Sequence, residues 1–300
     1  MLTKSNSVKE DLHEVDGWSS YAKRKSAFAK SKLVEFNTPL DFLDLFRCGK
    51  YFPAIALDIR MTRTDDGFLL EGARELAGRF RLKLIDVQLN IRYVHLAPNI
   101  VEAHRKQLQL SPYQFNFVDN RLKQINIPPG TVSLNLPHVY LNRLPRVVYC
   151  ALVDTNALTG SSIGFDRDRF HFGQYDLSYI AVKKDGIVQS SAHQFSFGAD
   201  GSGQLKAFRA LQTSVGISDN FGSSNDLKFS EFLDSKYIIA FNFFADLSNF
   251  CPLTSGSSGE LSLDLMFRNE TNTPLTLLLY SSYNALLTID NLNNVTNIVF

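Results

Sequence analysis

The fold class is decided by the stretch Leu261-Ser-Leu-Asp-Leu-Met-Phe267. Every second side chain in it is apolar: Leu261, Leu263, Leu265 and Phe267. A two-residue period places these side chains on one face of a β-strand and leaves Ser262, Asp264 and Met266 on the other. The stretch therefore predicts a strand that covers a core with one face only.

Most of the chain around this stretch has the same character, and 12% of all residues are aromatic, including 24 Phe. Aromatic and β-branched side chains favour pleated, half-buried surfaces. Further strands are predicted at Leu40–Phe46, Ile55–Met61, Phe80–Tyr93 with a β-bulge at Leu84-Ile85, Phe115–Ile127, Val132–Leu136, Arg146–Val153, Leu177–Lys183, Ile187–Gln189, Tyr237–Ala245 and Leu275–Ile289. Turns are predicted at Asp65-Asp66-Gly67 and Lys184-Asp185-Gly186.

Only two segments have helical spacing, Pro98–Leu110 and Gln204–Thr213. Many strands at short intervals with two brief helices predict an all-β protein, an antiparallel sandwich or jelly roll. A chain of 300 residues can bury a sizeable core without disulfides.

Charge and cysteine content exclude several classes of protein. The formal net charge of +1 argues against binding to nucleic acid or membrane through the overall field. Cys48, Cys150 and Cys251 have no metal-like or redox spacing and indicate buried thiols in a reducing compartment. Residues 1–10 do not resemble a secretory signal, and apolar runs such as Tyr237–Ala245 are too short to span a membrane. We expect an intracellular protein that is not secreted.

The first thirty residues are polar and lack a sustained apolar period, which predicts an arm or loosely packed segment over residues 1–30. It contains the basic cluster Lys23, Arg24 and Lys25. A solvated arm is one interpretation of this cluster, and a weak DNA contact or a nuclear signal is the other.

No motif of catalysis or of cofactor binding is present in the sequence. The stretch Gly198–Gly203 lacks the lysine and framing of a phosphate-binding loop and is interpreted as a flexible loop. The alternating Asp166-Arg167-Asp168-Arg169 is interpreted as a solvated ladder of charges, and Asp246 as the cap of a turn. The histidines are scattered singly: His13, His95, His104, His138, His171 and His193. We therefore predict no catalytic, cofactor-binding or metal-binding residue, with His171 a structural residue.

Several stretches, taken in order along the chain, resemble one family. They are Phe80–Pro98, Ala103-His104, Leu144-Pro145-Arg146, Leu152–Gly160, His171–Leu177, Asp185-Gly186, Phe241–Ser248, Gly259–Phe267 and Leu279–Asp290. Together they resemble the capsid proteins of Polinton/Maverick elements and adintovirus-like viruses, including transposon-derived invertebrate proteins. The resemblance covers most of Lys32–Phe300.

The resemblance implies a double jelly-roll major capsid protein that forms trimeric, hexon-like capsomers. It implies no catalysis and no cofactor. The family carries a further stretch upstream that holds most of the first jelly roll. We therefore expect residues 31–78 to be a remnant of that roll and residues 79–300 to be the C-terminal jelly roll. Either the chain is a shortened copy, or residues 1–30 substitute for the missing part.

The implied partners are further copies of the chain, as a homotrimer and a capsomer lattice, with a penton or minor capsid protein as a further candidate. The implied location is the virion capsid, assembled in the nucleus or cytoplasm of the host. Candidate contact loops are Thr155–Arg169 and Ser214–Leu227. Two other hypotheses stay open: a ligand- or glycan-binding β-sandwich, and a hydrolase or metal oxygenase on a jelly roll.

Overall fold

The computed structural model describes residues 33–35, 52, 56, 58–91, 93–215, 227–243, 258–292 and 294–299. Several sequence predictions lie outside these residues: the strand at Leu40–Phe46, the arm with Lys23, Arg24 and Lys25, the thiols of Cys48 and Cys251, and the cap at Asp246. Of the strand expected at Ile55–Met61, Ile55 and Leu57 also lie outside, and its described residues belong to no strand, so that prediction is wrong for them.

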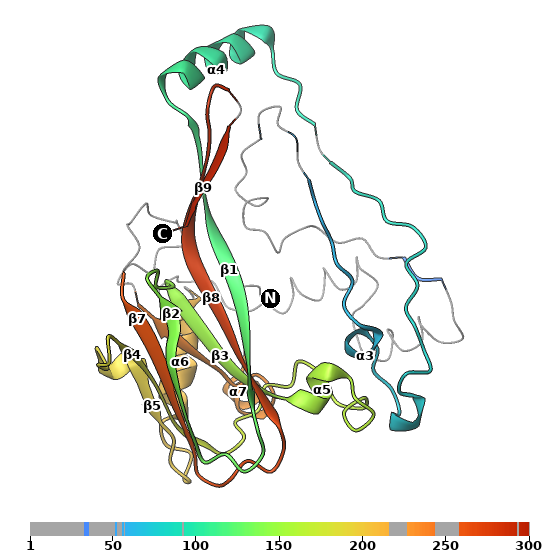
Figure 1. Ribbon diagram of the computed structural model, residues 1–300, viewed down its shortest axis with the longest axis vertical. Helices are drawn as coiled ribbons and strands as arrows, with labels where there is room; N and C mark the ends of the chain where they lie inside the picture. The colour runs from blue at the N-terminus through green and yellow to red at the C-terminus, as the bar shows by residue number, and fades with distance from the viewer. Residues whose placement is uncertain are drawn as a thin grey trace.

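The described strands form two antiparallel sheets that face each other (Figure 1). One sheet has the order β1-β8-β3-β6, with β9 added beside β8, and the other has the order β2-β7-β4-β5. The strands are β1 (Tyr113–Ile127), β2 (Ser133–Leu141), β3 (Val147–Asp154), β4 (Leu177–Lys184), β5 (Gln194–Ser196), β6 (Ile238–Asn242), β7 (Glu260–Phe267), β8 (Leu275–Ile289) and β9 (Val295–Val299).

The pairing of the first eight strands is that of one long nested hairpin. The first pairs with the eighth, the second with the seventh, the third with the sixth and the fourth with the fifth, all antiparallel. Contacts of β3 with β8 and of β4 with β7 roll this hairpin into two sheets. This arrangement is a complete eight-stranded jelly roll. The predicted fold class is confirmed.

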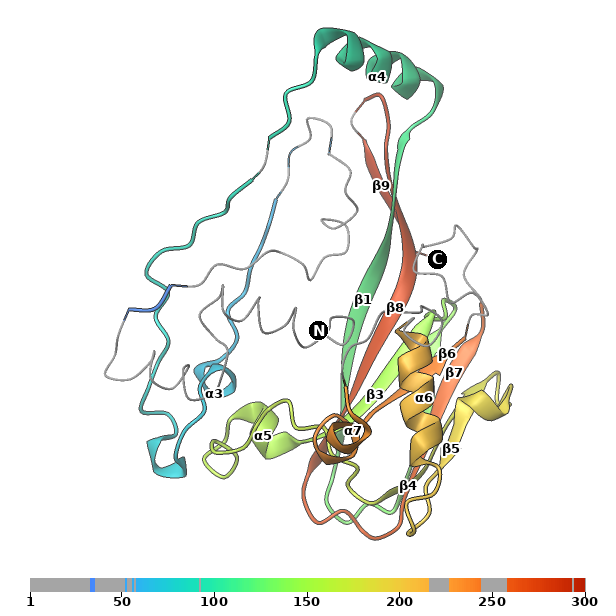
Figure 2. The same ribbon diagram turned by 180° about the vertical axis from the view of Figure 1, so that it is seen from behind.

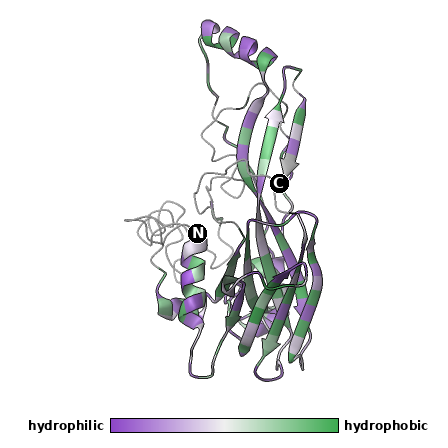
Figure 3. Ribbon diagram, turned by 90° about the vertical axis from the view of Figure 1, so that its left-hand side faces the viewer, coloured by the Kyte–Doolittle hydropathy of each residue, from purple (hydrophilic) through white to green (hydrophobic). Residues whose placement is uncertain are grey.

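The core lies between the two sheets, and the alternation along the strands explains which side chains enter it (Figure 3). In β7 the predicted apolar face, Leu261 to Phe267 at every second residue, is buried. All but one of the side chains of β3 are buried, as its continuous apolar run suggests. The largest fully buried side chains are Tyr237, Phe195, Phe232, Phe241, Ile127, Leu144, Leu177, Ile180, Leu211, Ile239, Leu261 and Leu265.

Both predicted helices are present, as α4 (Pro98–Leu110) and α6 (Gln204–Ser214). In α6 the side chains of Ala207 and Leu211 are fully buried, and Lys206 Nζ donates to the carbonyl oxygens of Ser191 and Gln194 at 2.6 and 3.1 Å. These contacts hold the helix against β5 and β6 at one edge of the sandwich (Figure 2).

The sequence did not predict five further short helices: α3 (Asp66–Leu69), η3 (Arg74–Leu76), α5 (Thr155–Thr159), η4 (Ser191–His193) and α7 (Phe229–Asp234). The turn expected at Asp65-Asp66-Gly67 is therefore wrong in type, because α3 begins there. The turn after β4 is confirmed, with Asp185 and Gly186 both at positive φ (51° and 79°). The strand expected beyond it reduces to a single bridge between Lys184 and Ile187.

Three strands extend beyond the sandwich (Figure 1). Strand β8 pairs with β3 from Leu275 to Ser282 and with β9 from Ala285 to Ile289, while β1 pairs with its full length. Helix α4 lies across the far end of this extension.

Candidate assembly surfaces

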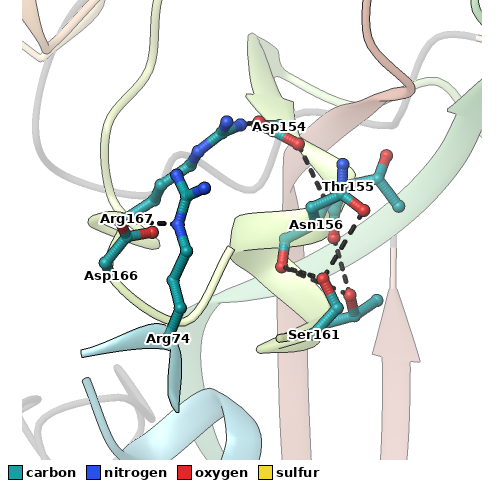
Figure 4. Close-up of polar contacts among 8 residues, drawn as sticks. Arg74, Asp154, Thr155, Asn156, Ser161, Asp166 and Arg167 are labelled. Carbon is teal, nitrogen blue, oxygen red and sulfur yellow. Dashed lines mark hydrogen bonds and ion pairs between the residues drawn. The ribbon is translucent and has the colours of Figure 1, made fainter. Parts of the chain in front are cut away.

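The loop after β3, expected to make contacts in an assembly, is an ordered structure in the protein. Asp154 ends β3, and its carboxylate accepts a hydrogen bond of 2.9 Å from the amide of Asn156, which caps α5 (Figure 4). The start of the expected loop Thr155–Arg169 is therefore helical, because an aspartate in the position of Asp154 stabilises the first turn of a helix. Thr155 Oγ1 lies 2.8 Å from Thr276 Oγ1 on β8 and ties the helix to the sheet.

A segment from the N-terminal side of the chain packs against this loop. We call residues 65–76, which include α3 and η3, the docked segment. The amide of Gly72 donates to the carbonyl oxygen of Phe165 at 3.1 Å. Arg74 Nε donates to the carboxylate of Asp166 at 2.8 Å, as Figure 4 shows. Gly67 and Gly160 are in backbone contact, because a Cβ on Gly160 would lie 1.9 Å from the Gly67 oxygen. The loop surface is thus covered in part by the same chain.

Arg169 holds the docked segment to the loop. Its side chain is only 4% exposed, and its guanidinium donates to four carbonyl oxygens. Two belong to the docked segment, Gly67 at 2.8 Å and Leu70 at 2.5 Å. The other two belong to the loop, Phe165 at 3.3 Å and Arg167 at 3.0 Å. Burial lowers the pKa of the guanidinium, and the charges of Glu71 and Asp168 oppose this effect.

The interpretation of Asp166-Arg167-Asp168-Arg169 as a solvated ladder is therefore wrong for Arg169, whereas Asp166 and Asp168 are exposed as expected. Arg169 is buried, Arg167 binds the carboxylate of Asp154, and Asp166 binds Arg74. An alternating run of charges does not show which backbone carbonyl oxygens will lie nearby in the fold. The sequence therefore did not predict that Arg169 anchors the docked segment. No local feature of the sequence marks Arg169 for burial, since the adjacent Phe170 is itself 58% exposed.

A hollow of about 430 Å³ lies beside this loop, lined by Asp154, Ala157, Arg167, Asp168, His171, Tyr175 and Thr273. Its charged groups are already engaged, because Asp154 binds Arg167 and Asp168 accepts the amide of Phe170 at 2.8 Å. His171 is exposed and lies in no strand. In the described part of the chain, no three His, Cys, Asp or Glu side chains are grouped as a metal site.

A second exposed surface is formed by the described residues of the extended segment, residues 80–94 without Arg92, which links the docked segment to α4 (Figure 1). The strand predicted there is wrong for the described residues, because none of them pairs with another strand. Its alternate apolar side chains stay largely in solvent, from 48% exposed at Leu89 to 71% at Ile85 and 80% at Tyr93. Exposure on this scale marks surfaces that bind a partner.

A third exposed surface lies on the outer face of the β1-β8-β3-β6 sheet. Leu122, Tyr280 and Tyr149 are neighbours in register across β1, β8 and β3, and the two rings are 6.2 Å apart. We call these residues the aromatic row. Leu122 is 54% exposed and Tyr280 43% exposed, whereas Tyr149 is partly buried and its hydroxyl donates to the carbonyl oxygen of Ser214 at 3.2 Å. Leu122 and Tyr280 therefore present the apolar surface of the row to the outside of the roll.

Other predicted features are described only in part. Of the loop Ser214–Leu227, only Ser214, Val215 and Leu227 are described. The predicted buried thiol is confirmed for Cys150. His193 is hydrogen-bonded through Nε2 to the carbonyl oxygen of Asn242 at 3.0 Å. Among the described residues, no helix is both long enough and apolar enough to cross a membrane.

Comparison with known proteins gives matches among solved structures only. No family model matches the chain, and no curated protein sequence matches it. It is similar to a chain in the cryo-EM structure of the Sputnik virophage, with 14% identity over 63% of this chain and 38% of that chain, and a TM-score of 0.38. It is also similar to a chain of the PBCV-1 virus capsid, with 10% identity over 66% and 54% of the chains and a TM-score of 0.39.

A further similarity is to the major capsid protein of mavirus, with 11% identity over 63% of this chain and 41% of that protein, and a TM-score of 0.35. The chain therefore spans between 38% and 54% of the length of these proteins.

Proposed function

We propose that the chain is a structural subunit of a viral capsid, a hexon-like major capsid protein of the Polinton/Maverick type that assembles into trimers. The observation that carries this proposal is a complete jelly roll with apolar surface left exposed in two places, the extended segment and the aromatic row. The ordered resemblance of Lys32–Phe300 to that capsid family supports the same role. A jelly roll alone supports many functions, so the proposal depends on these surfaces and on the resemblance.

The proposed role is one of assembly and not of catalysis. The charged groups beside the hollow bind one another or the backbone, as Asp154 and Arg167 do, and so hold the loop in place. In the proposed shell, the aromatic row meets a neighbouring copy of the chain. A formal net charge of +1 allows copies to pack without strong mutual repulsion.

We also propose the division of the chain that the resemblance implies, with residues 31–78 as a remnant of a first jelly roll and residues 79–300 as the C-terminal one. In this arrangement the docked segment, anchored by Arg169, is where the remnant meets the C-terminal roll. The proposed location is the capsid of a virion assembled inside the host cell, with a penton or minor capsid protein as a further partner. Contact of Lys23, Arg24 and Lys25 with DNA belongs to the same proposal.

Size-exclusion chromatography with light scattering tests the proposal. The expected mass is three times the 33.8 kDa of one chain. Substituting the exposed aromatic row, as in Tyr280→Lys, weakens the trimer, whereas Leu205→Lys, at an exposed leucine of α6, leaves it intact. A strictly monomeric wild-type chain at high concentration contradicts the proposal and leaves the binding sandwich as the alternative.

A further inference from the structure

The extended segment has the chemistry of a β-strand without a partner strand. Among the described residues between Lys83 and Leu96, no backbone amide or carbonyl makes a hydrogen bond. The apolar side chains of Ile85, Val87, Leu89 and Ile91 are each about half exposed or more. An unpaired strand with free backbone groups and an apolar face is a template for pairing with another chain.

The order of residues in this segment is symmetric about Leu89. Moving outward by equal steps, polar Gln88 and Asn90 are equivalent, and so are apolar Val87 and Ile91. The next pair is Asp86 and Arg92, of opposite charge, followed by the apolar pair Ile85 and Tyr93. Two antiparallel copies centred on Leu89 therefore place apolar side chains opposite each other on one face of the pair. In the same pairing, position 86 of each copy is opposite position 92 of the other, which sets an aspartate opposite an arginine in the sequence.

We propose that the extended segment pairs antiparallel with the same segment of a second copy, about a two-fold axis at Leu89. A two-fold contact of this kind is self-complementary, so each favourable cross-strand pair occurs twice. Moving the centre by one residue places Asp86 opposite Asn90 or Val94 and separates the charges. If the two-fold axis lies between two residues instead of at one, the apolar side chains around the centre of one copy are opposite polar side chains of the other. The sequence thus favours one partner, a second copy, and one register.

This contact goes beyond the proposed trimer, because a two-fold axis joins two copies independently of a three-fold one. Each cross-strand pair contributes little free energy, and two strands alone are of marginal stability. The contact between isolated copies is therefore weak and short-lived. A disulfide that forms only in the correct register traps it.

The experiment uses the full chain with Cys48→Ser and Cys251→Ser, with the buried Cys150 left in place. Opposite residues of an antiparallel pair have Cα atoms about 4.5–5.5 Å apart, which a disulfide spans. Leu89→Cys alone therefore forms a disulfide-linked dimer under mild oxidation. Val87→Cys alone does not, because its two copies are offset by four residues, about 13 Å. A mixture of the Val87→Cys and Ile91→Cys chains forms the dimer again.

Charge reversal supplies the matched control. Asp86→Arg or Arg92→Asp, added singly to Leu89→Cys, lowers the rate of cross-linking several-fold, and the two together restore it. Leu110→Cys, at a leucine that is 83% exposed on α4, measures random collision. The proposal is overturned if Leu89→Cys cross-links no faster than Leu110→Cys, or if Val87→Cys alone cross-links as fast as Leu89→Cys. Because the trimer is measured separately by light scattering, failure of the strand pairing leaves the proposed function standing.

Discussion

Replacing Arg169 by Met tests whether this buried guanidinium holds the docked segment. The methionine keeps most of the apolar side chain and removes all four hydrogen bonds. Two of them, to the carbonyl oxygens of Gly67 and Leu70, cross from the loop to the docked segment. A hydrogen bond from a charged group contributes about 1.5–3 kcal/mol. Removing the two that reach the docked segment therefore destabilises its docked state by at least about 3 kcal/mol. That loss raises the population of the undocked state about a hundredfold.

The amide of Gly72 reports this change, because its hydrogen bond to Phe165 crosses the same contact. Hydrogen exchange in the Arg169→Met chain is expected to be about a hundredfold faster at Gly72 and unchanged in β7 and β8. Arg105→Met, at an exposed arginine of α4, is the matched control and leaves both rates unchanged. Equal exchange at Gly72 in the two variants would refute the anchoring role of Arg169.

Three further predictions concern the same regions and the core. Gly160→Ala and Gly130→Ala both cost about 1 kcal/mol, because both glycines have positive φ (62° and 82°), but only Gly160→Ala also collides with Gly67. Urea unfolding is expected to show a larger loss of unfolding free energy for Gly160→Ala than for Gly130→Ala, and hydrogen exchange at Gly72 is expected to be faster in Gly160→Ala. Equal effects of the two substitutions would contradict the close contact between Gly160 and Gly67. Hydrogen bonds from Arg63 and from the amide of Leu82 hold the pKa of Asp66 below its usual 3.8. The stability that the ionised Asp66 carboxylate contributes is therefore present at pH values above the pKa of the unfolded state. It is lost as the pH falls through the lower pKa of the folded state. The protection factor of the Leu82 amide, its intrinsic exchange rate divided by its observed rate, should fall on acidification in the wild type and stay constant with pH in Asp66→Asn. Burial raises the pKa of the Cys150 thiol, so a maleimide should label Cys150 only during unfolding, and rapid labelling of the native chain would contradict its burial.

The sequence predicted the elements whose limits are set by local chemistry. Helix α4 begins at Pro98, which is well suited to the first helical turn, and ends before Ser111-Pro112. Strand β8 has the predicted bounds, Leu275 and Ile289. The fold class, an antiparallel sandwich or jelly roll, followed from the number and spacing of such strands, and the eight-stranded roll confirms it.

Features that depend on distant partners could not be predicted. The extended segment has the same alternation as β7, yet β7 lies between β2 and β4, whereas the extended segment pairs with no strand that the structure describes. Alternation shows which face is apolar and does not say whether a neighbouring strand exists. The burial of Arg169 likewise depends on carbonyl oxygens about a hundred residues away in the sequence, at Gly67 and Leu70. Neither contact leaves a local signal.

Electron microscopy of the purified full chain tests the central claim most directly. If the chain is a capsid subunit, class averages will show particles with three-fold symmetry, with three jelly rolls around the axis, or closed shells built from them. Particles of single-chain size at every concentration, with no symmetric assembly, would contradict the claim.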